Sequence, residues 1–110
     1  MNIKKEKLGD FSILKIKGRV DTVHSAELEA EVIKLFDSGE TNVIFNCSDM
    51  NYISSSGLRV FLVAQKRAIA INGKLFLCNM QPPIKEIFRI SGFANLFRIF
   101  DTQEEALESQ

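Results

Sequence analysis

The sequence has no excess of charge of either sign, and this absence limits the partners that long-range electrostatics could attract. The 14 Lys and Arg residues balance the 14 Asp and Glu residues, so the formal net charge at pH 7 is +0. A chain without net positive charge has no overall field to draw in nucleic acid or an anionic membrane surface. We therefore expect neither direct nucleic-acid binding nor a membrane partner.

The sequence also lacks a long apolar segment. Residues Met1–Lys7 do not contain the apolar centre of a signal peptide, and no other stretch approaches the roughly 20 apolar residues of a membrane-spanning helix. The hydrophobic content of 45% and the charged content of 25% are those of an ordinary soluble globular protein. We therefore expect one cytoplasmic domain over residues 1–110, large enough to bury its own core.

Cysteine and histidine are too scarce to indicate metal or nucleophilic chemistry. Cys47 and Cys78 each end an expected strand, and two ligands make a poor metal site, so buried thiols are favoured over a disulfide or a metal. The single His24 lies near Asp21 and Ser25, which formally offers a Ser-His-Asp triad. The spacing provides no nucleophile elbow and no adjacent oxyanion loop. We predict no enzyme activity, no cofactor and no metal.

The apolar pattern predicts a β-hairpin followed by alternating helices and strands. The hairpin strands are expected at about residues 2–7 and at Phe11–Lys17, with a turn at Gly9-Asp10 and a break at Gly18. Three further strands are expected at Val43–Phe45, Lys74–Cys78 and Phe97–Phe100, and four helices at about 22–38, 58–71, 82–91 and 103–107. The fold class is therefore α/β, a small mixed sheet with about four helices packed on it.

The helix expected over 58–71 carries a wide apolar arc, which predicts deep burial against the sheet. The arc consists of Val60, Phe61, Ala64, Ala68 and Ile71, flanked by Leu58, Leu62 and Ile69. Lys66 and Arg67 mark the exposed side. The strand Val43–Phe45 is apolar on both faces, as suits a sheet covered on both sides. Asn46 at its end either points toward the serines that follow or satisfies loop backbone groups.

Ser54, Ser55 and Ser56 lie between this strand and this helix and are followed by Gly57. Serine is a favoured N-cap, and a helix N-terminus also suits an anion such as phosphate. Gly57 permits a close backbone approach that a side chain would block. Arg59, expected in the first turn, is either simply solvated or helps to hold a phosphate. The stretch is therefore an ordinary helix cap or a phosphoserine switch.

Four segments, taken together, resemble the STAS domain family. Gly18–Asp21 resembles the G-x-[ILV]-D turn of that family, and Asn46 resembles the Asp or Asn that ends its central strand. Ser54–Leu58 resembles the D-S-[SA]-G-L signature. Ile84–Phe93 resembles the late helix, which ends in Ser-Gly and a bulky apolar residue. The segments follow the family's order and cover nearly the whole chain.

Among STAS domains, a free-standing domain of this length resembles the bacterial anti-sigma factor antagonists. The resemblance implies binding to an anti-sigma factor with serine kinase activity, and thereby release of a sigma factor. It also implies that this kinase phosphorylates the serine after the signature Asp, which corresponds to Ser55, and that a metal-dependent serine phosphatase reverses the step. The partner-binding residues implied in the same way are Asp21, Asn46, Ser54, Ser56 and Gly57.

The chain departs from the signature at Ser54, which replaces the Asp. A missing negative neighbour makes a phosphate at Ser55 easier to hold, but it also removes a candidate recognition group for a kinase. Phosphorylation is then altered or lost, or the kinase has diverged. The alternative function is a phosphorylation-independent STAS subunit of a sensory or lipid-transport complex. A small enzyme that uses Ser55 or Ser56 as nucleophile ranks last.

Overall fold

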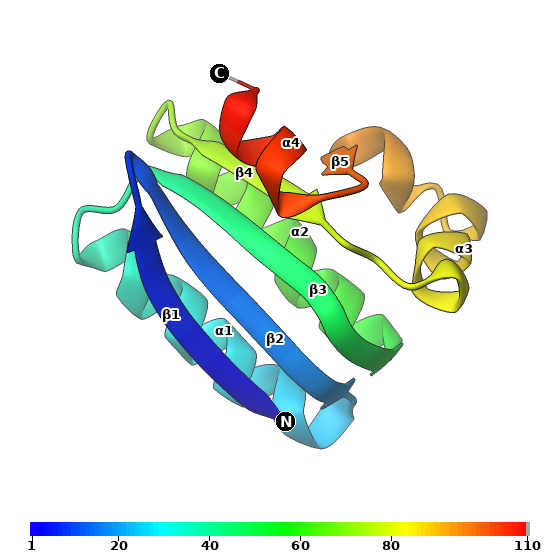
Figure 1. The fold of residues 1–110 in the computed structure, drawn as a ribbon. Helices are drawn as coiled ribbons and strands as arrows, with labels where there is room; N and C mark the ends of the chain where they lie inside the picture. The colour runs from blue at the N-terminus through cyan, green and yellow to red at the C-terminus, as the bar shows by residue number, and fades with distance from the viewer. Residues whose placement is uncertain (110) are drawn as a thin grey trace.

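The structure, a computed structural model that describes residues 1–109, is a five-stranded mixed sheet with helices on both faces (Figure 1). The strands lie in the order of the sequence: β1 (Asn2–Leu8), β2 (Phe11–Val20), β3 (Asn42–Ile53), β4 (Lys74–Cys78) and β5 (Arg98–Phe100). The helices are α1 (Thr22–Asp37), α2 (Ser55–Ala70), α3 (Pro82–Ile90) and α4 (Gln103–Glu108), with a 3-10 helix η1 (Phe93–Leu96) before β5. The expected α/β class, a mixed sheet with about four helices, is confirmed.

The hairpin β1–β2 is antiparallel, whereas β2–β3, β3–β4 and β4–β5 pair in parallel. The two outer strands are therefore β1 and β5. Each parallel connection carries one or more helices across the sheet, as parallel pairing requires. The carboxyl ends of β2, β3 and β4 consequently lie on the same side of the sheet, where the strands end, and α1, α2 and α3 all start there.

The sheet separates two apolar cores. The larger core contains Phe45 of β3 and lies beneath α1, α2 and α3, whereas the smaller one contains Ile44 and lies beneath Ala106 of α4 (Figure 1). Phe61 of α2 is fully buried in the larger core, where its ring centroid lies 5.1 Å from that of Phe45 and 5.6 Å from that of Phe88. Burial on both faces of β3 confirms the prediction made from its apolar run.

Two strands are longer than the apolar pattern predicted. β2 does not break at Gly18 but continues to Val20, with Gly18 at φ +99° beside a shift in the β2–β3 register. β3 continues past Asn46 to Ile53, because its polar segment stays paired with β2 after two register shifts, one between Lys15 and Lys17 and one between Gly18 and Arg19. Apolar periodicity does not report such pairing, since the shifts interrupt the alternation of inward and outward side chains.

Helix α2 begins at Ser55, three residues before the predicted start, and ends at Ala70. Its buried residues include Leu58, Val60, Phe61, Ala64 and Ala68, as predicted. The assignment of Ile69 and Ile71 to the buried arc is wrong, because these side chains are 68% and 45% exposed. Ile71 is the C-cap and no longer follows helical spacing. Ile69 is rotated about 100° from Ala68 around the helix axis and falls outside the arc.

Both cysteine thiols are buried, as expected, but they face different cores. Cys47 lies within β3 rather than at a strand end, and Cys78 ends β4. Desolvation by burial raises the pKa of both thiols, and that of Cys78 reaches about 12. Thiols held in this protonated form are poor nucleophiles and metal ligands.

Among residues 1–109, the range that the structure describes, two kinds of feature are not found. No helix in this range is both long and apolar enough to span a bilayer. Within the same range, no group of three or more His, Cys, Asp or Glu side chains is placed to bind a metal ion.

Candidate functional site

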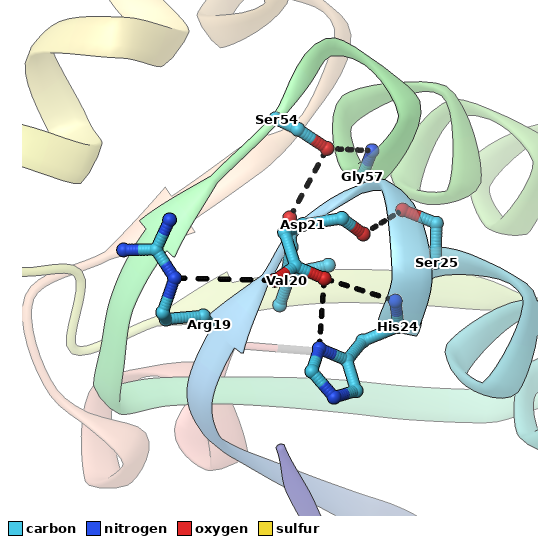
Figure 2. A network of polar contacts seen from close by, with 7 residues as sticks. All are labelled: Arg19, Val20, Asp21, His24, Ser25, Ser54 and Gly57. Atoms are coloured by element: carbon cyan, nitrogen blue, oxygen red, sulfur yellow. Dashed lines mark hydrogen bonds and ion pairs between the residues drawn. The ribbon is translucent and has the colours of Figure 1, made fainter.

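Two helix N-termini meet where the neighbouring parallel strands β2 and β3 end. Val20 and Ile53 are register partners at these strand ends, and the next residues, Asp21 and Ser54, cap α1 and α2 (Figure 2). A helix N-terminus carries unpaired N–H groups and partial positive charge. The candidate site is therefore the pair of helix starts, with residues 19–25 on one side and 52–59 on the other.

Ser54 connects the two helix starts. Its Oγ accepts a hydrogen bond from the Gly57 N–H at 3.1 Å, which is the N-cap contact, and its hydroxyl donates to the Val20 carbonyl oxygen at 3.2 Å. The Ser54 N–H also donates to the Val20 carbonyl oxygen, at 2.9 Å. A carboxylate at this position could replace the first contact but not the donation to the carbonyl. Ser54, and not Ser56, is therefore the capping residue.

Ser55 is the first residue of α2 and is exposed, whereas Ser56 is half-buried in the same turn. The first turn of α2 contains no acidic residue, and the cap before it is neutral. The positive partial charge at this helix start is therefore not offset by a side chain of its own turn. An added anion on Ser55 would meet favourable electrostatics within the chain.

Gly57 is buried and explains the tight packing of the turn. A Cβ at this position would lie 2.8 Å from Cγ1 of Ile53, 2.9 Å from Cγ1 of Val20 and 2.9 Å from the Val20 carbonyl oxygen. These separations are too short for a real side chain. The close approach that the glycine allows is thus between α2 and the ends of β2 and β3.

Asp21 forms the corresponding cap of α1, with a charged side chain. Its Oδ1 accepts the His24 N–H at 3.0 Å and lies 2.7 Å from His24 Nδ1, and Arg19 Nε lies 3.9 Å from the other carboxylate oxygen (Figure 2). The hydrogen bond from the His24 backbone, followed by the His24 side chain and by Arg19, holds the pKa of the Asp21 carboxyl below its usual value. Oδ1 of this carboxylate is thus held by His24, whereas Oδ2 has only the longer ion pair with Arg19.

The formal Ser-His-Asp combination is not assembled as a catalytic triad. Ser25 is buried, and its hydroxyl donates to the Asp21 carbonyl oxygen at 2.7 Å. The carboxylate of Asp21 holds the imidazole of His24, but the serine of this combination is bound to backbone. This serine therefore contributes a helix-start contact.

Sequence reasoning missed several partners at the site. Arg19 stacks on Tyr52, with its guanidinium carbon 4.1 Å from the ring centroid. Arg59 is in the second turn of α2 because the helix begins at Ser55, and its Nη2 lies 3.2 Å from a carboxylate oxygen of Glu29 on α1. Glu29 lies 30 residues before Arg59, so no local sequence pattern links them. Only the packing of α1 against α2 brings the two side chains together.

Asn46 does not point toward the serines, contrary to one of the two expectations. Its side chain is 9% exposed, donates to Gln103 Oε1 at 2.7 Å and accepts the Ser48 N–H at 3.0 Å. Residues on β3 alternate between faces, and the neighbouring Phe45 and Cys47 face the core beneath α1 and α2. Asn46 therefore lies on the opposite face, where it ties α4 to β3.

The mixed sheet with helices on both faces places this small single-domain protein in the α/β class. Its candidate site is an exposed serine at a capped helix start. Residues 2–106 match the STAS domain family, and the chain belongs to this family. The resemblance inferred from the four sequence segments is thereby confirmed.

Relatives of the chain are named as anti-sigma factor antagonists. BtrV of Bordetella bronchiseptica, which carries such a name, is 35% identical over 106 residues, or 96% of this chain and 91% of BtrV. A Thermotoga maritima structure with such a name matches with a TM-score of 0.92 at 19% identity, covering 96% of this chain and 92% of that chain. The Bacillus cell fate determinant SpoIIAA in its phosphorylated form matches with a TM-score of 0.75 at 22% identity, covering 97% of each chain. At these identities the two structures show the shared fold.

Proposed function

We propose that this protein is an anti-sigma factor antagonist that binds an anti-sigma factor with serine kinase activity and so releases a sigma factor. The kinase transfers the γ-phosphoryl group of ATP to Ser55 Oγ, which loses its proton, and binding is switched off. A metal-dependent serine phosphatase hydrolyses the phosphoserine and restores the active form. The observation that carries the proposal is the exposed Ser55 at the first position of α2. The antagonist name of the 35% identical BtrV supports it.

The environment of Ser55 suits a switch that leaves the fold intact. A phosphate adds about −1.5 to −2 charges at neutral pH, and a helix N-terminus favours negative charge. The cap residue Ser54 is neutral, so no carboxylate at that position repels the phosphate. The same charge placed against a partner without a counter-ion is heavily penalised. Phosphorylation should therefore weaken binding and spare folding.

The partner surface that we propose surrounds Ser55 at the two helix starts. Asp21, Ser54 and Ser56 are partly exposed there and can contact a partner directly. Gly57 is buried, so it contributes by letting the turn pack closely. Asn46 lies on the other face of the sheet, and its predicted part in partner binding is not needed for this surface.

The protein acts in this proposal by binding alone, without catalysis, cofactor or metal of its own. Its site of action is the cytoplasm, because sigma factors work there. It contacts neither nucleic acid nor a membrane directly. Asp21, His24 and Ser25, which formally offered a nucleophilic site, instead stabilise the start of α1.

The proposal is tested with Ser55 variants and the anti-sigma partner that co-purifies from the protein's own cells. Ser55→Ala should bind but resist inactivation by kinase and ATP. Ser55→Asp should fold normally and bind at least tenfold more weakly, about 1.4 kcal/mol by titration calorimetry. Ser38→Ala, at the exposed C-cap of α1 and thus at the end of that helix away from Ser55, is the matched control and should bind as the parent does.

Intact mass measurement gives the phosphate stoichiometry on the same samples. Ser54→Asp restores the carboxylate of the family signature and should speed phosphorylation if its loss impaired recognition by the kinase. Parental binding by Ser55→Asp, together with no phosphate on Ser55, would overturn the switch. The phosphorylation-independent STAS subunit would then take its place.

A further inference from the structure

Helices α1 and α2 run side by side and are joined by two ion pairs of the same kind. Arg59 Nη2 of α2 lies 3.2 Å from Glu29 Oε1 of α1, and Arg67 Nη1 lies 3.0 Å from Asp37 Oδ1. The step from 59 to 67 equals the step from 29 to 37, so the two helices are parallel and in register. We call Arg59–Glu29 the near pair and Arg67–Asp37 the far pair, according to their distance from Ser55.

The near pair is within reach of the Ser55 side chain. Arg59 follows Ser55 by four residues in the same helix, and residues at this spacing lie on one face with their Cβ atoms roughly 6 Å apart. Arg67 follows Ser55 by twelve residues, which places it about 18 Å further along the helix axis. Of these two guanidinium groups, therefore, only that of Arg59 can meet a group attached to Ser55.

We propose that Arg59 is the internal counter-ion of a phosphate on Ser55, and that its guanidinium leaves Glu29 for the phosphate when Ser55 is modified. The inference rests on the proposed phosphorylation of Ser55. It gives that modification a second effect, because the near pair opens while the far pair stays closed. The carboxylate of Glu29 then becomes unpaired on α1, one helix away from the modified serine.

The charges and exposures favour this exchange. A phosphate carries about −1.5 to −2 charges and three acceptor oxygens, whereas the Glu29 carboxylate carries one charge. Guanidinium groups bind phosphate oxygens in a bidentate manner. The side chain of Arg59 is 63% exposed and that of Glu29 is 30% exposed, so water screens the existing pair and little is lost when it opens. Asp21, the nearby carboxylate, is held by His24 and Arg19.

The first test measures the phosphate itself. Phosphoserine is inserted at position 55 of the full chain during translation, so that no kinase is needed, and the phosphate pKa is followed by phosphorus NMR. Loss of the counter-ion in Arg59→Gln should raise the phosphate pKa by about 0.3 pH units or more. Arg67→Gln removes the same charge from the same helix and should leave that pKa at the parental value. An equal pKa in the parent and Arg59→Gln overturns the proposal.

The second test measures the exchange of partners through the Nε–H signal of Arg59. In the unmodified protein Glu29→Gln should shift this signal, because the near pair is broken. In the phosphoserine protein the same substitution should not shift it, since Arg59 has already left Glu29. The Nε–H signal of Arg67 should stay constant in all four samples, which are the parent and Glu29→Gln, each with and without phosphoserine at position 55. An equal response of Arg59 to Glu29→Gln in both forms overturns the exchange.

These outcomes are distinguishable from failure of the proposed function. A lack of phosphate on Ser55 in cells counts against the kinase switch alone, because the encoded phosphoserine still reports the Arg59 contact. An unchanged phosphate pKa in Arg59→Gln counts against the counter-ion alone, because kinase action and partner release do not enter that measurement.

Discussion

The starts of α1 and α2 have the same backbone geometry but caps of different charge, an anionic Asp21 and a neutral Ser54. Each follows the end of a parallel strand, and each cap side chain accepts the N–H of the residue three positions on: Asp21 from His24 and Ser54 from Gly57. Asp21 brings a carboxylate, which offsets the charge of its helix start and is held by the imidazole of His24. Ser54 brings a neutral hydroxyl, so the charge of the α2 start is left for another group.

This difference shows how one domain can place a helix start with an anionic cap beside one with a neutral cap. At α1 the anion is the side chain of Asp21, which the backbone N–H and the imidazole of His24 hold in place. At α2 the cap is satisfied without charge, and the exposed Ser55 follows it directly. Substitutions in the packing and in the cap of α2, and a substitution that removes the charge of the α1 cap, test this difference.

Removing the packing beneath α2 should have the largest effect. Phe61 is fully buried between Phe45 and Phe88, so Phe61→Ala should cost about 3–5 kcal/mol through lost burial and a residual cavity. Urea unfolding measures the change, with exposed Lys66→Ala as the control. A loss below about 1 kcal/mol would show that Phe61 does not anchor the helix.

Filling the space at Gly57 should have the next largest effect. The added methyl group of Gly57→Ala would meet Ile53, Val20 and the Val20 carbonyl oxygen at 2.8–2.9 Å. Overpacking of this kind costs about 1–3 kcal/mol, because the strand ends or the helix must shift. Ser56→Ala, at the preceding and half-buried position, is the matched control and should unfold close to the parental denaturant midpoint. Equal midpoints for the two variants would contradict the tight packing assigned to Gly57.

Removing the cap of α2 should have a smaller effect. Ser54→Ala leaves the Gly57 N–H and the Val20 carbonyl without the serine hydroxyl, and losing an N-cap costs about 0.5–2 kcal/mol. Ser54→Asp keeps an acceptor for Gly57 and should recover most of this stability at neutral pH. Thermal unfolding of the parent and both variants provides the comparison. Stability in Ser54→Ala equal to the parent would show that Ser54 does not cap the helix.

Neutralising the cap of α1 should have the smallest effect, and one that depends on pH. Asp21→Asn keeps an N-cap acceptor but removes the charge. The folded state lowers the pKa of Asp21, so its carboxylate stabilises the fold above the unfolded pKa, and this contribution disappears as pH falls through the folded pKa. The parent should therefore be the more stable protein at pH 7, and the gap should close below about pH 4. A gap that does not change with pH would exclude a role for the charge.

The sequence was sufficient to predict those features that depend on neighbouring residues. The serine stretch marked the start of α2 to within three residues, Gly9-Asp10 marked the hairpin turn, and the spacing of apolar residues placed Phe61 in the core. Local propensity and periodicity carry this information because it is confined to a few adjacent positions.

The features that the sequence did not reveal depend on distant segments. The Gln103 partner of Asn46 is 57 residues away, and the Glu29 partner of Arg59 is 30 residues away. Ser54 rather than Ser55 or Ser56 caps α2, and Ser54 is held at the end of β3 because its N–H and its hydroxyl both donate to the distant Val20 carbonyl oxygen. Register shifts likewise keep the polar part of β3 paired with β2. None of these contacts has a periodic or local sequence signal.

The outer strand β1 bears on a different property, resistance to aggregation. An unpaired sheet edge is a template on which another chain can add a strand. Here that edge carries Lys4, Lys5 and Lys7, all exposed. Lysines on an edge strand discourage the addition of another strand, and here Lys5 and Lys7 are also paired with Glu31 and Glu40 of their own chain. The opposite edge, β5, is only three residues long and offers little to extend. Both edges of this sheet are thus protected against fibrous assembly.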